Sequence, residues 1–278
     1  MVKATFRWTL LLASLFALGP LAYAATHHLR DADHGPAATL LVGDSMGAGL
    51  LAGLIVFAIA AVAGAIGARF FAFHTGLTAA GFVVAWGAWG LGTLDAIARR
   101  AREASDLPVL AIEGLLVMGV AIALTWGLER LAPKAPPASE SPLNPAGTKG
   151  ITAGAITAAV VGGLAVWIFC MTTYKGQTVA CAALAGILGA AAAQLVAAFL
   201  GSSIGALPPM LGLAALALVG PLAARLMHDA QFVQAVFNAG VLPLVKPLSL
   251  DWAAGALIGV PIGLSWAGSM LERKPITA

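Results

Sequence analysis

Eight long apolar stretches constrain this chain more than any other feature. A helix needs about 20 mostly apolar residues to cross a bilayer. None of the stretches alternates like an amphipathic strand, and an open sheet edge has no hydrogen-bond partner in lipid. The sequence therefore predicts an all-α fold, a polytopic transmembrane helical bundle of about eight membrane-spanning helices. The expected spans cover residues 8–25, 39–68, 75–98, 108–129, 150–172, 178–200, 207–227 and 250–271.

The composition excludes a soluble domain. Hydrophobic residues make up 60% of the 278 residues and charged residues only 10%, whereas soluble domains carry about 25% charged residues. The 15 basic and 12 acidic residues form no basic stripe, so we expect no nucleic-acid partner. We expect the lipid bilayer as the main partner and a bacterial inner (plasma) membrane as the location. No residue pattern indicates a particular cofactor.

A proline-rich segment at residues 131–149 divides the chain. Its prolines are Pro133, Pro136, Pro137, Pro142 and Pro145. Such a composition is typical of an extended linker. We therefore expect a first group of four spans in residues 1–130 and a second group of four in residues 150–278. Residues 228–238 are amphipathic, which predicts a short helix lying in the membrane interface.

The first apolar stretch has two interpretations. Lys3 and Arg7 precede the apolar run 8–18, residues 19–20 (Gly-Pro) interrupt it, and residues 22–24 read A-x-A. This order of features is typical of a cleaved signal peptide, but an uncleaved anchor helix has the same composition. The basic residues in the loops divide almost evenly between the two sides. The positive-inside rule therefore assigns no orientation.

Residues 43–47 read GDSMG, which matches the G-x-S-x-G pattern of a hydrolase nucleophile elbow. That elbow needs a strand, a sharp turn and a helix on an α/β scaffold, and no such scaffold is predicted here. Intramembrane proteases of the rhomboid family carry a G-x-S-G serine, and this chain has Met46 in place of the second glycine. We therefore expect no catalytic role for Ser45 and no enzymatic activity.

Glycines at helical spacing predict faces for close helix packing. Gly43 and Gly47 are four residues apart, which places them on one helix face. The last stretch carries Gly255, Gly259 and Gly263, one per turn. Small residues at this spacing let two membrane helices approach closely. The neighbour could belong to this chain or to another membrane subunit.

Two acids inside apolar stretches are the main candidates for a functional role. Asp44 lies five residues into the second predicted span and Glu113 five residues into the fourth. Both spans run in the same direction, so the two acids lie at similar depth near one membrane face. An ionisable residue inside a span marks a functional site by default. We predict that they line a cavity that binds a cation or relays protons. The alternative is that each acid pairs with an arginine or caps a helix near the headgroups.

Gln194, in the sixth stretch, is a further transport or ion-binding candidate. The alternative for this amide is a hydrogen bond to a neighbouring helix. Cys170 and Cys181 flank a short turn and form either a disulfide or two buried thiols. The loop after the first stretch carries metal-ligand residue types, although their spacing matches no established motif. These weak metal candidates are His27, His28, Asp31, Asp33 and His34.

Two functional classes remain open from the sequence. The first is a small cation- or proton-linked transporter or permeation pathway that uses Asp44 and Glu113. The second is a non-catalytic structural or assembly subunit of a larger membrane complex. A transporter predicts a shared cavity for the two acids. An assembly subunit predicts paired acids at the surface and a glycine face left towards lipid or a partner chain.

Overall fold

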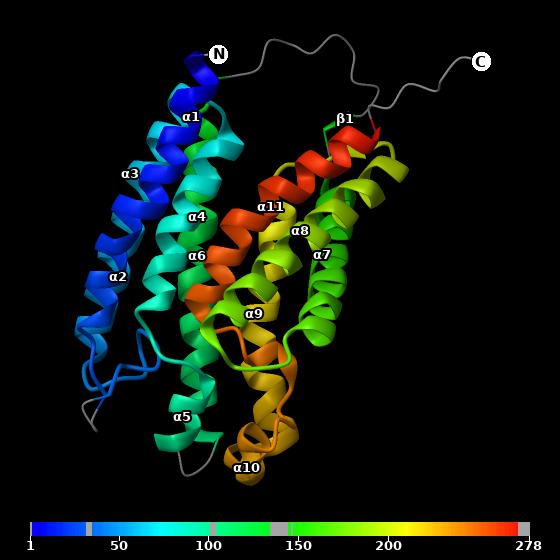
Figure 1. Ribbon diagram of the computed structural model, residues 1–278. Coiled ribbons are helices and arrows are strands. Elements are labelled where there is room, and N and C mark those ends of the chain that lie inside the picture. The colour runs from blue at the N-terminus through cyan, green and yellow to red at the C-terminus, as the bar shows by residue number, and fades with distance from the viewer. Residues whose placement is uncertain (1, 32–34, 101–103, 134–143, 146, 272–278) are drawn as a thin grey trace.

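The computed structural model describes residues 2–31, 35–100, 104–133, 144–145 and 147–271, and these form a bundle of long helices (Figure 1). Within these residues, eight helical segments are long and apolar enough to cross a membrane. This confirms the predicted all-α, eight-span fold. The segments are Ala4–His27, Met46–Phe70, Phe73–Arg100, Ala104–Leu131, Thr148–Phe169, Lys175–Phe199, Leu207–Phe237 and Ser249–Leu271.

Successive spans run in opposite directions through the bundle (Figure 1). The first four spans contain α1 (Val2–Ala13), η1 (Ser14–Leu18), α2 (Gly19–His27), α3 (Met46–Phe70), α4 (Phe73–Trp89), α5 (Leu94–Arg100), η2 (Ala104–Asp106) and α6 (Leu107–Leu131). The last four contain α7 (Thr148–Phe169), α8 (Lys175–Phe199), α9 (Leu207–His228), η3 (Asp229–Gln231), α10 (Phe232–Phe237), η4 (Pro243–Val245) and α11 (Ser249–Leu271). The two-residue strands β1 (Asn144–Pro145) and β2 (Ser202–Ser203) pair in parallel.

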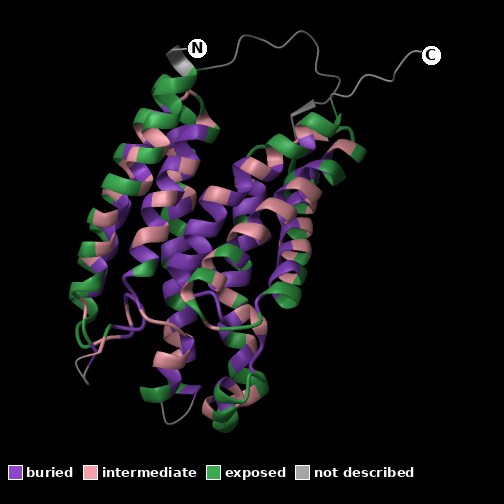
Figure 2. Ribbon diagram, in the orientation of Figure 1, coloured by how far each residue is buried: buried purple, intermediate pink, exposed green. Residues whose placement is uncertain are grey.

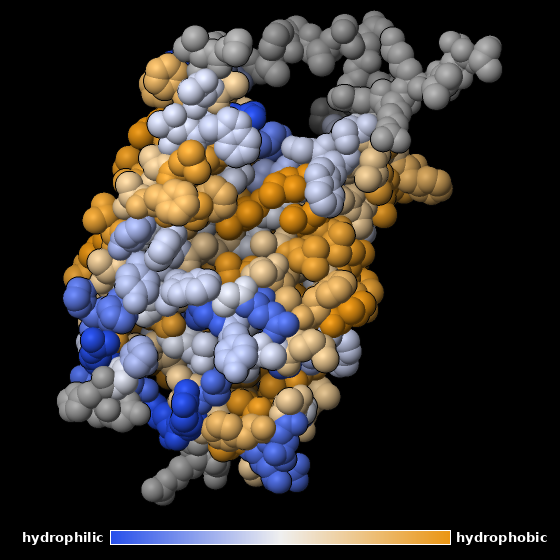
Figure 3. Space-filling view, viewed as in Figure 1, coloured by the Kyte–Doolittle hydropathy of each residue, from blue (hydrophilic) through white to orange (hydrophobic). Residues whose placement is uncertain are grey.

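The bundle has two ends, named here by their place in Figure 1. The upper end carries the turn between α3 and α4 and the segment 200–206. The lower end carries residues 28–31, 35–45, 170–174 and 238–248, together with α5 and α10. The outer surface between the ends is largely apolar, and hydrophilic patches gather mainly towards the lower end in this view (Figure 3). This distribution fits a bundle whose sides face lipid.

Helix α11 lies at the centre of the bundle. It packs against α8 and α9 and also against α4 and α6 of the first four spans. Its residues are mostly buried, whereas the outward sides of α1 and α2 are exposed (Figure 2). The division into two groups of four helices stays a prediction, and the two sets of spans share α11 as a common contact.

The glycines of α11 lie against the backbone of α8. A methyl group added at Gly259 would lie 2.2 Å from the carbonyl oxygen of Ala183, and one added at Gly263 would lie 2.2 Å from that of Ile187. At Gly255 the same methyl group would lie 2.3 Å from the carbonyl carbon of Ala182. These distances leave no room for a side chain, so the glycine face is used inside the chain.

The predicted pair Gly43 and Gly47 does not form such a face. Gly43 precedes α3, and a methyl group added at Gly47 would meet no atom within 4 Å. Close packing begins two residues later, at Gly49, which lies against Leu40 together with Gly53. The small residues of α3 therefore pack against the non-helical segment of the same chain that contains Leu40.

Two prolines in the second half of the chain each free a peptide unit one turn earlier in the same helix, and each freed unit faces a glycine of the first half. Pro221 lies inside α9 and Pro261 inside α11, and both helices continue through them. Each proline leaves the carbonyl four residues earlier without its helical N–H donor. The freed carbonyl of Ala217 faces Gly114 of α6, at 2.6 Å from an added methyl group. The peptide unit after Leu257 faces Gly81 of α4 in the same way. The glycines thus allow both freed peptide units to pack against a neighbouring helix.

Candidate functional site

A non-helical segment, residues 35–45, enters the lower end of the bundle. It contains buried apolar residues, including Ala38 and Leu40, and ends where α3 begins at Met46. The prediction of a helix from residue 39 is therefore wrong. The apolar residues of the segment 35–45 belong to a loop that is buried among helices. Such a segment at membrane depth must find partners for its backbone N–H groups within the protein.

Ser45 has a structural role at the end of this segment. It is the N-cap residue of α3 and accepts a hydrogen bond from the backbone N–H of Ala48 at 3.3 Å. A serine side chain at this position satisfies one of the unpaired donors of a helix start. The GDSMG stretch is therefore a loop-to-helix junction.

Glu113 supplies the acceptors that the buried segment needs. Its carboxylate accepts hydrogen bonds from the Thr39 hydroxyl at 2.5 Å, from Leu41 N at 2.7 Å and from Leu40 N at 3.3 Å. A fourth bond comes from the hydroxyl of Ser249, in the first turn of α11. The residue is 1% exposed. One carboxylate thus joins α6, the segment 35–45 and α11.

The surroundings of Glu113 favour proton chemistry over cation binding. A bound metal cation needs several oxygen ligands around it, whereas all four atoms that contact this carboxylate donate hydrogens to it. A protonated carboxyl has less acceptor capacity and gains one O–H donor. Protonation would therefore weaken or reverse at least one of the four bonds. A change in the protonation of Glu113 would therefore alter its bonds to both the segment 39–41 and α11.

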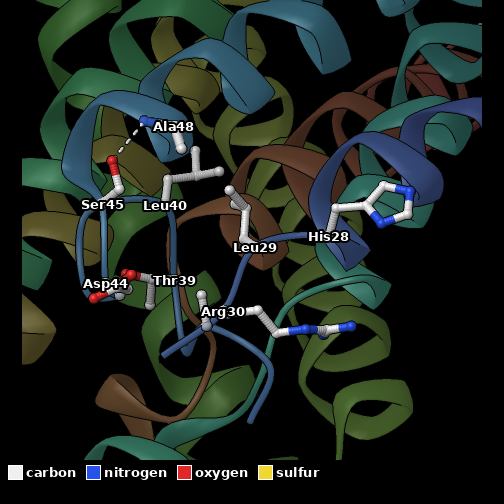
Figure 4. Close-up of a pocket in the computed structure, with 10 residues that line it drawn as sticks. His28, Leu29, Arg30, Thr39, Leu40, Asp44, Ser45 and Ala48 are labelled. Atoms are coloured by element: carbon white, nitrogen blue, oxygen red, sulfur yellow. Dashed lines mark hydrogen bonds between the residues drawn. The ribbon is translucent and has the colours of Figure 1, made fainter. Parts of the chain in front are cut away.

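Asp44 lies near the same end but not beside Glu113. It is exposed, precedes α3, and its backbone N–H donates to Arg30 O at 2.9 Å. It lines a cavity of about 200 Å³, here named the loop cavity, together with His28 and Thr39 (Figure 4). Glu113 is not among the residues that line this cavity, so the two acids do not share it. The Thr39 hydroxyl lies between them, since Thr39 lines the loop cavity and donates to Glu113.

A second buried carboxylate, Asp251, lies in the first turn of α11. It is 0% exposed and accepts from Leu248 N at 3.0 Å, as an acid in the first helical turn does in a capping box. It also accepts from the Thr178 hydroxyl at 2.9 Å and from Lys175 Nζ at 3.2 Å, both in α8. We predicted no role for Asp251 from the sequence. A proline shortly before it, Pro247, marks a helix start that could have drawn attention to it.

Lys246 is a buried ammonium group beside this network. It is 4% exposed, and its Nζ donates to Met171 O at 2.8 Å and to Cys170 O at 3.0 Å. Burial lowers its pKa, while the neighbouring thiols of Cys170 and Cys181 act in the opposite direction. The side chain holds the turn between α7 and α8 against the segment that precedes α11.

The two cysteines are free thiols, and both are buried. Burial, together with the nearby Cys181 thiol, raises the pKa of Cys170 to about 12. At that pKa about one thiol in 10⁴ is ionised at pH 8, compared with about a quarter of exposed thiols.

We expect N-ethylmaleimide to modify Cys170 at pH 8 at least about 10³-fold more slowly in the folded protein than after unfolding. Mass spectrometry of labelled peptides measures this ratio. A Gly268→Cys variant provides a reactive control, because a side chain at that position meets no atom within 4 Å. Labelling of Cys170 at the rate of the control would contradict the buried, protonated thiol.

Gln194 lies at the opposite end from Glu113. Its Oε1 accepts from Ile204 N at 3.2 Å, so the amide binds the segment that follows its own helix, and no bond to a neighbouring helix is among those of the described residues. It lines a cavity of about 580 Å³, here named the upper cavity. This cavity lies between α4, α6, α8 and α11, with His74, Glu129 and Ser265 among its lining residues. It is larger than the loop cavity and is lined by polar as well as apolar residues.

The weak metal candidates do not converge in the described part of the chain. His27 stacks on Tyr23, His28 lines the loop cavity, and Asp31 pairs with Arg100. Asp33 and His34 lie outside the described residues. Within those residues, no group of three or more His, Cys, Asp or Glu side chains could hold a metal ion.

Comparison with protein-family models, with curated proteins and with solved structures finds no match to this chain. Its class therefore rests on its own fold. The eight apolar helices define a multi-pass membrane protein. Within that class, the buried carboxylates of Glu113 and Asp251 at the lower end and the polar cavity at the upper end are the features from which a function can be argued.

Proposed function

We propose that this protein is a small proton-linked transporter of the bacterial inner membrane, with no enzymatic activity. The observation that carries the proposal is the contrast between the two ends of α11. Its first turn is bound on one side to Glu113 and on the other to Lys175 and Thr178. Its last two turns line the upper cavity, which separates α4 and α6 from α8. In this proposal, the transport pathway is closed at the lower end and open at the upper end.

Helices α8 and α11 are suited to move together in this proposal. Their backbones touch along the glycine face at Gly255, Gly259 and Gly263. Motion that opens the lower end would then occur between this pair and α4 and α6. The hydrogen bond from Ser249 to Glu113 crosses that boundary. Transporters commonly rock one helix set against another around a central site.

Glu113 is the residue that links protons to this motion. Water in the loop cavity reaches Thr39, whose hydroxyl donates to Glu113. Protonation of the carboxylate weakens its bonds to the segment 39–41 and to Ser249, and this loosens the lower closure. The upper cavity, with Glu129 and Gln194 on its walls, receives a small polar or cationic solute.

A flux measurement in proteoliposomes tests the proposal. We expect internal pH, followed with a trapped pH-sensitive dye, to respond to an imposed membrane potential or to a Na⁺ or K⁺ gradient. Glu113→Gln should lower that response at least about 10-fold, because the amide does not exchange the proton. Asp229→Asn changes an exposed acid at the same end and should leave the rate unchanged. Rates equal to those of protein-free vesicles under all three gradients would contradict the proposal.

The second candidate is a non-catalytic assembly subunit of a larger membrane complex. One observation favours it, an apolar groove of about 390 Å³ lined by Leu15, Ala85, Trp86, Trp89 and Val179. Its lining fits a partner helix. Filling it with Val179→Trp should then release the chain from its native complex in blue native electrophoresis and leave flux unchanged.

A further inference from the structure

A pocket at the lower end holds an acid and a base that do not satisfy each other. It has a volume of about 270 Å³ and is lined by Asp95 of α5, Lys246, and residues of the turn 171–174 and of α10. We name it the lower pocket. It is separate from the loop cavity and from the upper cavity, since the three share no lining residue.

Within the described part of the chain, the base in this pocket has one N–H donor without an acceptor. Lysine carries three N–H donors, and the Nζ of Lys246 gives two of them to Cys170 O and Met171 O. Within the described residues, no carboxylate lies within 4.0 Å of this nitrogen. A charge that is 4% exposed and has no counter-ion is costly to hold. An anionic group in the pocket would supply the missing charge.

The acid in this pocket has an unused acceptor. Oδ1 of Asp95 is buried and has no hydrogen-bond partner within the described residues. Its other oxygen lies 3.8 Å from Arg99, whose side chain is 66% exposed, so that ion pair is weak. Buried polar atoms are nearly always hydrogen-bonded, so an orphan oxygen calls for a partner. An N–H donor in the pocket would supply it.

The rim of the lower pocket places it at the level of lipid headgroups. Three of its exposed residues are apolar or aromatic, since Met171 is 65% exposed, Tyr174 76% and Phe237 56%. Thr172 adds an exposed hydroxyl to the same rim. Aromatic residues are enriched where a membrane protein meets the headgroups. The pocket holds roughly nine water volumes at about 30 Å³ each, which suits a headgroup and is small for a drug-sized ligand.

We propose that the lower pocket binds the headgroup of an aminophospholipid. The phosphate accepts from Lys246, and the primary ammonium donates to Oδ1 of Asp95. The acyl chains leave over the apolar rim formed by Met171 and Phe237. Choline and glycerol headgroups fit less well, because a trimethylammonium has no N–H donor and glycerol carries no positive charge.

Thermal unfolding of the detergent-purified protein in mixed micelles tests this proposal. We expect phosphatidylethanolamine to raise the Tm by about 2–4 °C more than phosphatidylcholine or phosphatidylglycerol at the same mole fraction. Asp95→Asn should abolish the preference for ethanolamine over choline. Lys246→Met should abolish the stabilisation by all three lipids, and Lys246→Arg should retain it. Asp229→Asn, an exposed acid at the same end, should behave like the unaltered protein.

Three outcomes would overturn the assignment. The first is an equal response of the unaltered protein to ethanolamine and choline lipids. The second is an intact preference in Asp95→Asn, which is close to isosteric and so expected to fold. The third is a full shift produced by soluble ethanolamine phosphate while phosphatidylethanolamine produces none, since this would assign the pocket to a free solute.

Discussion

Gly259→Leu is expected to lower the Tm of the purified protein by about 6–12 °C. The added side chain would start 2.2 Å from Ala183 O, 2.8 Å from Ile187 N and 2.9 Å from the Cα of Gly186. All three atoms belong to the backbone of α8, so no rotamer change relieves the clash. Overpacking costs up to about 3 kcal/mol and occasionally more. Each kcal/mol corresponds to about 2–4 °C in a chain of this size.

The control for this prediction lies in the same helix. Gly268→Leu adds the same side chain where no atom lies within 4 Å, and we expect its Tm to stay within about 2 °C of the unaltered protein. Gly259→Ala should fall between the two. Size-exclusion chromatography in detergent checks that the variant is folded and not aggregated before its Tm is measured. Equal Tm values for Gly259→Leu and Gly268→Leu would show that α8 and α11 do not touch at this glycine face.

The membrane spans were predictable because the hydropathy of the sequence is enough to locate them. Lipid is the solvent for these surfaces, so a run of about 20 apolar residues has few alternatives to a membrane helix. The prediction failed at the second span, which begins at Met46 and not at residue 39. The segment before it is apolar because it is buried among helices. Hydropathy does not distinguish that environment from lipid. The cap at Ser45 was the local signal for the true start.

The candidate site was predictable only in part. Glu113 stood out because an acid inside a span is rare. Its partners did not, because Thr39 lies 74 residues away in the chain and Ser249 lies 136 residues away. Nothing in the sequence around either residue marks its hydroxyl as a partner of Glu113, and only the fold brings both to one carboxylate. Asp44 was the opposite case, since its position inside a span followed from the misplaced helix start.

The glycine patterns separate in the same way. The face at Gly255, Gly259 and Gly263 lies on a continuous helix, so its one-per-turn spacing has the meaning that helical geometry gives it. The spacing of Gly43 and Gly47 has no such meaning, because Gly43 is outside α3. A four-residue spacing therefore predicts a packing face only where both residues belong to one helix. The neighbouring pair, Gly49 and Gly53, meets that condition and packs on Leu40.

Glu113 and Asp251 both hold the first turn of α11, and in the proposed transporter they would close the lower end in different ways. Glu113 accepts only from neutral groups, so its charge can be removed without leaving an unpaired base. Asp251 accepts from Lys175, so loss of its charge would strand an ammonium that is 11% exposed. A pathway that opens on protonation needs the first kind of acid at the moving boundary. The second kind suits the fixed contact between α11 and α8.

Asp251→Ala is expected to destabilise the protein by about 3–5 kcal/mol, a loss in Tm of roughly 6–20 °C. The substitution removes the partner of Lys175, whose side chain is 11% exposed, and it leaves the N–H of Leu248 without an acceptor. The Thr178 hydroxyl loses one of its two acceptors and keeps the carbonyl oxygen of Lys175 at 3.0 Å. A buried donor left unpaired costs about 1–3 kcal/mol of desolvation, and this cost is part of the expected loss of about 3–5 kcal/mol. Thermal unfolding followed by circular dichroism measures the change.

A double variant separates the ion pair from the space that it fills. Lys175→Met with Asp251→Leu replaces both charges by apolar side chains, and such replacements are often neutral or stabilising. We expect it to recover at least half of the Tm lost in Asp251→Ala. Asp229→Ala, at an exposed position of the same end, should change the Tm by about 2 °C or less. If Asp251→Ala unfolds no earlier than Asp229→Ala, the carboxylate does not hold α11 to α8, and the proposed fixed contact at the lower end is lost with it.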